Sequence, residues 1–133
     1  MIWKLTDKLY WGDMNAPKEY KEHNIQTLIC TAEELPYPEN IGIPFIRFPV
    51  PNGHPVPAKV QELFIDMVKP LFSKEIPLLI YCQGGQNRSA GLALLWLVKI
   101  AGKSHEEAWK TIKAVREDSL TWSKDFNDIK ELK

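Results

Sequence analysis

The sequence predicts an α/β fold: a central, mainly parallel sheet flanked by helices. Two observations lead to this prediction. Short runs rich in β-branched and aromatic residues alternate along the chain with segments whose apolar residues recur at helical spacing. The most apolar short run, residues 78–81, is followed after a glycine-containing loop by an almost wholly apolar segment, residues 88–101. Such a pair is typical of a buried central strand and the helix that covers it.

The first third of the chain is predicted to hold short strands and one short helix. Residues 3–11 alternate loosely between apolar and polar side chains, which indicates one or two strands ending at Gly12. Residues 15–23 carry a proline in their first turn, and this position is typical of the start of a helix. Residues 25–30 form a compact apolar run and are expected to be a buried strand.

The middle of the chain is predicted to contain a long loop, a strand and a helix. Most of the ten prolines lie between residues 35 and 57, which are expected to be mainly loop. Within them, residues 44–50 form a strand whose prolines favour a sheet edge or a strand end. A helix is expected over residues 58–72. Its apolar stripe should face the core and consists of Val60, Leu63, Phe64, Met67, Val68 and Leu71.

The last third is predicted to be helical. Residues 88–101 are nearly all apolar, so this helix should be buried on most sides. Gly102 ends it, and Ser104 with Glu107 opens the next helix in a capping-box pattern. A final helix is expected from about Ser123.

Composition limits the class of protein. A chain of 133 residues can form one domain, expected over residues 1–133, whose core needs neither disulfides nor metal. Seventeen Lys and Arg balance seventeen Asp and Glu, which gives no signature of a nucleic-acid or membrane-surface binder. The longest apolar run, residues 90–98, has nine residues, well short of the roughly 20 that a membrane helix needs. No signal-peptide core follows the N-terminus, so a cytoplasmic protein is expected. The sequence gives no sign of the oligomeric state, and a monomer is the expectation.

The two cysteines and three histidines show no disulfide framework and no metal-ligand spacing. Neither a metal nor another cofactor is expected. Cys30 ends a buried strand and is interpreted as core filler in preference to a redox partner for Cys82.

The strongest chemical signal is the loop between the predicted central strand and the apolar helix. Cys82 leaves the strand, and Arg88 follows five residues later at the start of the helix. Small residues allow successive backbone N–H groups to turn inward, and the helix dipole adds positive charge there. The predicted phosphate-binding residues are therefore Gln83, Gly84, Gly85, Gln86, Asn87 and Arg88.

The same loop predicts a nucleophile. Helix N-termini and nearby cations stabilise a thiolate, so Cys82 is the candidate attacking group. The Arg88 guanidinium can bind two phosphate oxygens at once. In-line attack on a phosphoryl group would give a phosphocysteine that water then hydrolyses.

Cys82-x5-Arg88-Ser89 matches the signature loop of the cysteine-dependent protein phosphatases, and the chain resembles their compact dual-specificity branch. The resemblance extends to residues 9–13, 25–30, 45–53 and 106–116, which have the family's order. It implies a phosphatase acting on a phosphorylated protein or a small phosphomonoester. It also implies that Cys82, Arg88 and Ser89 are catalytic, with Ser89 stabilising the departing thiolate.

Two positions depart from the family pattern. Tyr81 stands where the family usually has histidine, and Asn52 occupies the position of the general acid. Because asparagine carries no titrating proton, His54 and Asp118 are the candidate general acids, and the absence of any general acid is the remaining alternative. An enzyme with little general-acid assistance favours substrates whose leaving group departs readily without a proton. Aryl phosphates such as phosphotyrosine are therefore the expected substrates.

Three alternatives stay open at this point. A pseudophosphatase would hold a phosphorylated ligand in the same loop and turn it over poorly. A rhodanese-type sulfurtransferase also places cysteine between strand and helix, but its loop is usually one residue shorter. An RNA 5′-phosphatase would share the fold, although the balanced charge favours it less.

Overall fold

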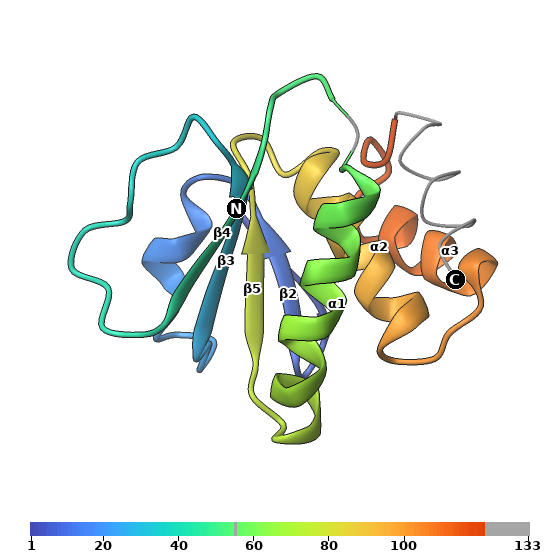
Figure 1. Cartoon of the computed structure of the whole chain (residues 1–133), viewed down its shortest axis with the longest axis horizontal. Coiled ribbons are helices and arrows are strands. Elements are labelled where there is room, and N and C mark those ends of the chain that lie inside the picture. Colours follow the sequence, from blue (N-terminus) through green and yellow to red (C-terminus); the bar gives the residue numbers. More distant parts are fainter. Residues whose placement is uncertain (55, 122–133) are drawn as a thin grey trace.

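The computed structural model describes residues 1–54 and 56–121 (Figure 1). Strands and helices alternate along this part of the chain, as the sequence predicts. In order they are β1 (Ile2–Thr6), β2 (Leu9–Gly12), the 3-10 helix η1 (Ala16–Glu19), β3 (Thr27–Ala32), β4 (Phe45–Val50), α1 (Ala58–Ser73), β5 (Leu78–Tyr81), α2 (Arg88–Lys99) and α3 (His105–Val115).

The five strands form one mixed sheet in the order β1-β2-β5-β3-β4. Strands β2, β5, β3 and β4 run parallel, and β1 pairs antiparallel with β2 at one edge. Strand β5 is the middle strand, and β4 lies at the opposite edge, as its prolines predict. The α/β fold with a mainly parallel central sheet is thus confirmed.

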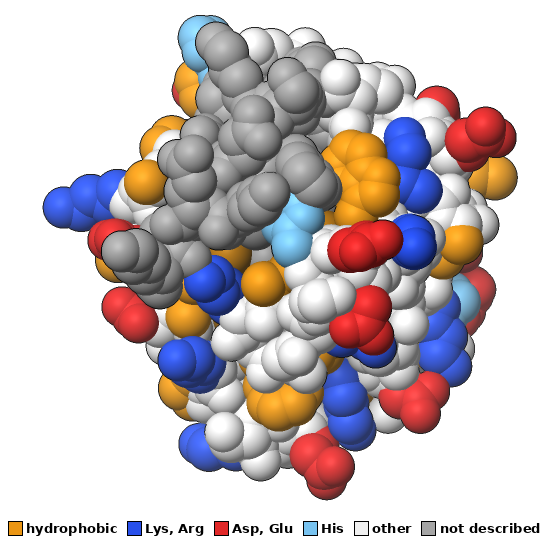
Figure 2. Space-filling view, turned by 90° about the vertical axis from the view of Figure 1, so that its right-hand side faces the viewer, with side chains coloured by type: hydrophobic (Ala, Val, Ile, Leu, Met, Phe, Trp, Pro, Cys, Tyr) orange, Lys and Arg blue, Asp and Glu red, His pale blue; other side chains and the backbone are white. Residues whose placement is uncertain are grey.

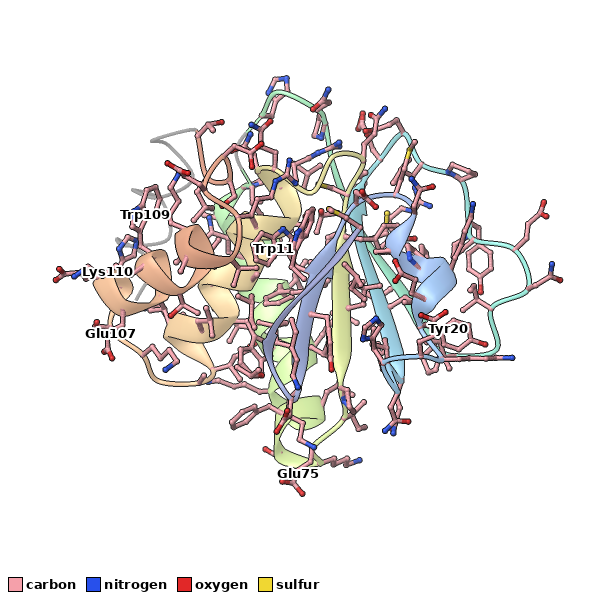
Figure 3. All side chains as sticks on the ribbon, turned by 180° about the vertical axis from the view of Figure 1, so that it is seen from behind. Trp11, Tyr20, Glu75, Glu107, Trp109 and Lys110 are labelled. Atoms are coloured by element: carbon pink, nitrogen blue, oxygen red, sulfur yellow. The ribbon has the colours of Figure 1, made fainter. Side chains whose placement is uncertain are left out.

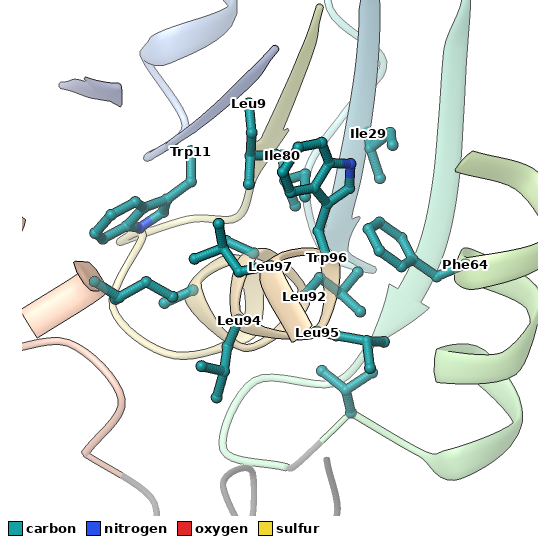
Figure 4. Close-up of a cluster of buried hydrophobic side chains, with 14 of the residues drawn as sticks. Leu9, Trp11, Ile29, Phe64, Ile80, Leu92, Leu94, Leu95, Trp96 and Leu97 are labelled. Carbon is teal, nitrogen blue, oxygen red and sulfur yellow. The ribbon is translucent and has the colours of Figure 1, made fainter. Parts of the chain in front are cut away.

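Each face of the sheet carries its own core. Helices α1, α2 and α3 cover one face, where Trp11, Phe64 and Ile80 are buried with the leucines of α2 (Figure 4). On the other face, η1 and the β3–β4 loop cover a smaller cluster that includes Cys30 and Tyr81. Successive residues of a strand point to opposite faces, so β5 has to be apolar throughout because it is buried on both sides.

The predicted helix over residues 15–23 is wrong in length. The structure has only the four-residue η1, and residues 20–24 form turns that end with Asn24 at φ +56. So short a polar segment has too few hydrogen bonds to offset the cost of helix nucleation. Strand β3 also lies two residues later than predicted, because Thr31 and Ala32 continue its pairing with β4.

The predicted apolar stripe of α1 is only partly buried. Phe64 and Val68 face the core, whereas Leu63 and Met67 are 46% and 44% exposed. The buried face instead includes Gln61, whose side-chain amide donates to the Val56 carbonyl at 2.9 Å. A helix that packs on the outside of a sheet buries only the side chains that face the sheet. In α1 this buried face is narrower than the stripe of apolar residues in its sequence.

The end of the described chain agrees with the prediction. The capping box is present, with Ser104 Oγ accepting from the Glu107 N–H at 3.1 Å and Glu107 accepting from the Ser104 N–H. The helix predicted from Ser123 lies outside the described residues. None of the described helices is long and apolar enough to cross a membrane. Acidic and basic side chains are interspersed on the face that Figure 2 shows.

Candidate active site

The predicted phosphate loop lies at the carboxyl edge of the sheet. The paired registers bring the ends of β2, β5 and β3 together there, with Tyr81 opposite both Gly12 and Cys30. A pocket of about 340 Å³ opens at this edge. It is lined by Asn52, Cys82, Gln83, Gly84, Gln86, Asn87 and Arg88. The structure therefore brings the predicted nucleophile, most of the predicted phosphate ligands and the general-acid position into one pocket.

The backbone carbonyls of the loop are turned away from this pocket. Those of Gln83, Gly84, Gly85 and Gln86 each accept a hydrogen bond from outside the loop. The donors are, in order, Met14 N (3.0 Å), Arg116 Nη1 (2.7 Å), Trp11 Nε1 (2.7 Å) and Leu120 N (2.9 Å). Because the C=O and the N–H of one trans peptide unit point in opposite directions, outward carbonyls leave the N–H groups of the following residues, Gly84 to Asn87, facing the pocket.

The backbone N–H groups of the loop form an anion cradle. Gly85 N–H donates to Cys82 Sγ at 3.2 Å. Within residues 1–54 and 56–121, no acceptor meets the N–H groups of Gln83, Gly84, Gln86, Asn87 and Arg88. Asn87 is the N-cap of α2 and Arg88 its first residue, so the helix dipole adds positive charge at these two N–H groups. Free donors and a helix N-terminus at one pocket bind tetrahedral anions.

Cys82 lies at the base of the cradle and is 3% exposed. Its Sγ is 3.2 Å from Ser89 Oγ, which also lies 3.3 Å from the Gly12 carbonyl oxygen. The single hydroxyl hydrogen of Ser89 can serve either acceptor. Together with the Gly85 N–H, it gives the sulfur two donors, and donors of this kind stabilise a thiolate.

Arg88 is fixed by a residue that sequence reasoning missed, Glu34. Arg88 Nη1 donates to Glu34 Oε1 at 2.7 Å and to the Val50 carbonyl at 2.7 Å, and Nη2 donates to Glu34 Oε2 at 2.6 Å. A guanidinium has five N–H donors. Three are thus engaged, and no residue in the described part of the chain accepts from Nε or from the second Nη2 hydrogen. These two lie on one edge, the fork that binds two phosphate oxygens.

A signal for Glu34 was present in the sequence. It follows a buried strand whose carboxyl end must meet that of β5, so an acidic side chain there can reach the loop. The Arg88 guanidinium lowers the pKa of Glu34, chiefly through their hydrogen bonds. Glu34 is a positioning residue for Arg88.

Replacing Glu34 with glutamine is expected to lower the free energy of unfolding by about 1 kcal/mol at pH 7, a small value because the Glu34 side chain is 34% exposed. A carboxyl whose pKa is lowered on folding stabilises the protein above its unfolded pKa, about 4.3, and loses this effect as the pH falls further. Urea unfolding should therefore show the difference at pH 7 and little of it near pH 3. Glu33→Gln is the matched control, and an equal loss in both variants would contradict the pairing.

The candidate general acids are not equally placed. Asn52 lines the pocket, whereas His54 is exposed and is not among the described residues that line it. Asp118 is held by Arg116, whose Nε donates to Asp118 Oδ1 at 2.7 Å. The hydrogen bond from Arg116 lowers the pKa of Asp118, and this disfavours the protonated form that a general acid needs.

The loop is supported from outside by Trp11, Trp3 and Arg116. The Trp11 side chain is fully buried between the sheet and the helices (Figure 3) and donates to the Gly85 carbonyl. Arg116 stacks over Trp3, 4.7 Å from the ring centroid, while it holds the Gly84 carbonyl. Gly85 has φ +69, and a Cβ there would come within 2.7 Å of the Trp3 ring. Only glycine fits this position without strain.

One described group of side chains has metal-ligand spacing, and it was not predicted. Glu19, Glu22 and His23 place their ligand atoms within 4.8 Å of one another. They lie at the end of η1 and in the turns that follow, and none of them lines the pocket at Cys82.

Comparisons with known proteins show the family and the fold. The family model "Dual specificity phosphatase, catalytic domain" matches residues 9–130. The active form of Tk-PTP has a TM-score of 0.86 at 22% identity, with 98% of this chain and 95% of that chain covered. Human DUSP28 has a TM-score of 0.88 at 16% identity, covering 98% and 91%. PTPMT1 in complex with PI(5)P has a TM-score of 0.84 at 14% identity, covering 98% and 93%. The curated proteins give no match.

Proposed function

The chain belongs to the dual-specificity phosphatase family, and on that premise we propose that it hydrolyses aryl phosphomonoesters such as phosphotyrosine through a phosphocysteine intermediate. One observation carries the proposal. The Cys82 sulfur, the free amides of its loop and the Arg88 side chain line a single pocket. This is the equipment that phosphoryl transfer to a thiolate requires: a nucleophile, an anion cradle and a clamp.

The first step would transfer the phosphoryl group to Cys82. The Sγ thiolate forms the S–P bond on the side opposite the leaving oxygen, and the P–O bond to the aryl group breaks. Negative charge on the equatorial oxygens meets the loop amides and the free edge of Arg88. The departing aryl oxide takes a proton from water, because Asn52 has none to supply.

The second step would release phosphate. Water attacks phosphorus, its proton passes to solvent, and the P–S bond breaks to regenerate the thiolate. Ser89 Oγ, 3.2 Å from Cys82 Sγ, can turn its hydrogen from the Gly12 carbonyl to the sulfur as negative charge returns there. This geometry supports the role that the family resemblance implies for Ser89.

Restoring an acid should separate substrates by their leaving groups. Asn52→Asp is expected to raise kcat on phenyl phosphate at least about 10-fold, since a positioned acid commonly gives 10²–10⁴. The effect on p-nitrophenyl phosphate should be much smaller, because p-nitrophenol leaves readily without a proton. A new alkaline limb in the pH–rate profile should accompany the gain.

The matched control for this added charge is Asn24→Asp. Asn24 is outside the pocket and has φ +56, a conformation that Asp tolerates. An equal change on both substrates for Asn52→Asp would show that position 52 does not serve the leaving group. His54→Ala tests whether His54 acts instead, and loss of an alkaline limb already present in the wild type would assign the acid to His54.

Asn52 also favours a second function, that of a phospho-ligand binding protein. A cradle that binds a phosphate dianion without an acid to complete the reaction holds its ligand for longer. Binding of a phosphotyrosine peptide by the wild type, with no phosphate released over hours, would favour this function over the enzyme.

A further inference from the structure

A second and larger pocket, of about 530 Å³, opens on the face of the sheet opposite α1, α2 and α3. Its walls come from the segment after β2 and from the β3–β4 loop, and Tyr81 contributes to its lining. We propose that this pocket is a recognition subsite for an uncharged, largely apolar side chain flanking the phosphorylated residue of a substrate protein. The inference rests on the proposed phosphatase function.

The two pockets share structural elements. Tyr81 lines the larger pocket and Cys82, the next residue, lines the smaller one. Met14 lines the larger pocket, and its backbone N–H donates to the Gln83 carbonyl of the phosphate loop at 3.0 Å. Glu34 holds Arg88, and Leu35, which follows Glu34, lines the larger pocket. The larger pocket therefore adjoins the phosphate loop, within reach of a peptide whose phosphate occupies that loop.

Tyr81 adds an aromatic residue to the lining of that pocket. The residue is 2% exposed, and burial, together with a hydrogen bond with the neighbouring Cys30 side chain, raises the pKa of Tyr81. Because its hydroxyl is buried beside Cys30, Tyr81 contributes apolar surface to the pocket and no free donor.

The walls suit an apolar side chain. Met14 and Tyr37 are 49% and 59% exposed at this pocket, and prolines separate further apolar residues along the loop. Pockets of this size and composition are typical of ligand sites. The charged lining residues are one cation, Lys18, and one anion, Glu39. Because the two charges of the lining are opposite in sign, the pocket suits an uncharged side chain. It offers no cluster of cations that would bind an anionic lipid headgroup.

The test measures kcat/KM for a set of phosphotyrosine heptapeptides in which one leucine is moved through the three positions on each side of the phosphotyrosine, against a serine background. We expect one position to raise kcat/KM about 10-fold or more, because burial of a leucine side chain commonly contributes a factor of that order. Met14→Ser and Tyr37→Ser should each reduce this preference. Met67→Ser is the matched control, since Met67 is 44% exposed on α1, outside the pocket.

The outcomes separate this inference from the proposed function. If the wild type does not hydrolyse p-nitrophenyl phosphate, the proposed function fails. Hydrolysis of p-nitrophenyl phosphate with no leucine preference at any position would overturn the subsite and leave the phosphatase intact. A Met14-dependent preference for PI(5)P in phosphatidylcholine vesicles, with none among peptides, would identify a lipid chain as the occupant and also overturn it.

Discussion

Replacing Cys82 with serine is expected to reduce hydrolysis of p-nitrophenyl phosphate at least about 10⁴-fold, the scale of effect seen when a catalytic nucleophile is removed. A serine hydroxyl stays protonated where a thiol can ionise, so the two donors at Cys82 Sγ would have no anion to stabilise. The amides of the loop are backbone groups and are unaffected by the change. The variant should therefore still bind orthovanadate or a phosphotyrosine peptide.

Cys30→Ser is the matched control, because Cys30 is the other buried cysteine and does not line the pocket. Its activity should stay within a few-fold of the wild type at a temperature where both are folded, as circular dichroism would show. Comparable losses in the two variants would contradict the assignment of Cys82 as nucleophile. Release of phosphate by Cys82→Ser at the wild-type rate would contradict it as well.

Replacing Arg88 with lysine should reduce kcat/KM on aryl phosphates about 10³-fold or more. Arg88 holds Glu34 and Val50 with one side of its guanidinium and leaves the other edge for phosphate. A lysine ammonium is a single point charge that cannot serve both sides at once. Each donor lost at a transition-state oxygen commonly costs 10²–10³.

Arg47→Lys controls for charge and for disturbance of the β3–β4 loop. Arg47 Nη1 donates to the Ala32 and Glu33 carbonyls at 3.2 and 3.3 Å, next to Glu34, yet it does not line the pocket. Single-turnover kinetics should show the Arg88→Lys defect in formation of the phosphocysteine. A defect of similar size in Arg47→Lys would mean that loop order, and not the guanidinium fork, limits the rate.

Much of the fold could be predicted because the pattern of apolar residues changes with the type of element. The strand at residues 78–81 is buried on both faces and is apolar throughout. Helix α2 is buried on most sides and is nearly all apolar. The predictions that were wrong involve weaker signals. The segment at residues 15–23 has a helix start but no apolar face, so its packing could not be inferred. On α1, Met67 and Phe64 look alike in the sequence, and only the tertiary packing distinguishes them.

The candidate site could be predicted where it is local in sequence. The loop from Cys82 to Arg88 carries its own glycines, its helix N-terminus and its arginine, so its chemistry can be inferred from a few consecutive residues. Glu34 and Trp11 could not be inferred in the same way. They reach the loop from 54 and 74 residues away, through strand order and side-chain direction. The departure at Asn52 could be recognised only because the family resemblance marks that position.

The hydrogen bonds that turn the loop carbonyls outward come from both ends of the described chain. Trp11 and Met14 belong to its beginning, and Arg116 and Leu120 to its end. During synthesis on the ribosome, Cys82 is translated after Trp11 and Met14 but before Arg116 and Leu120, so two of the four donors that shape its loop follow it. A nascent chain that has not yet reached Arg116 can therefore pair its five described strands while the Gly84 and Gln86 carbonyls still lack these two donors.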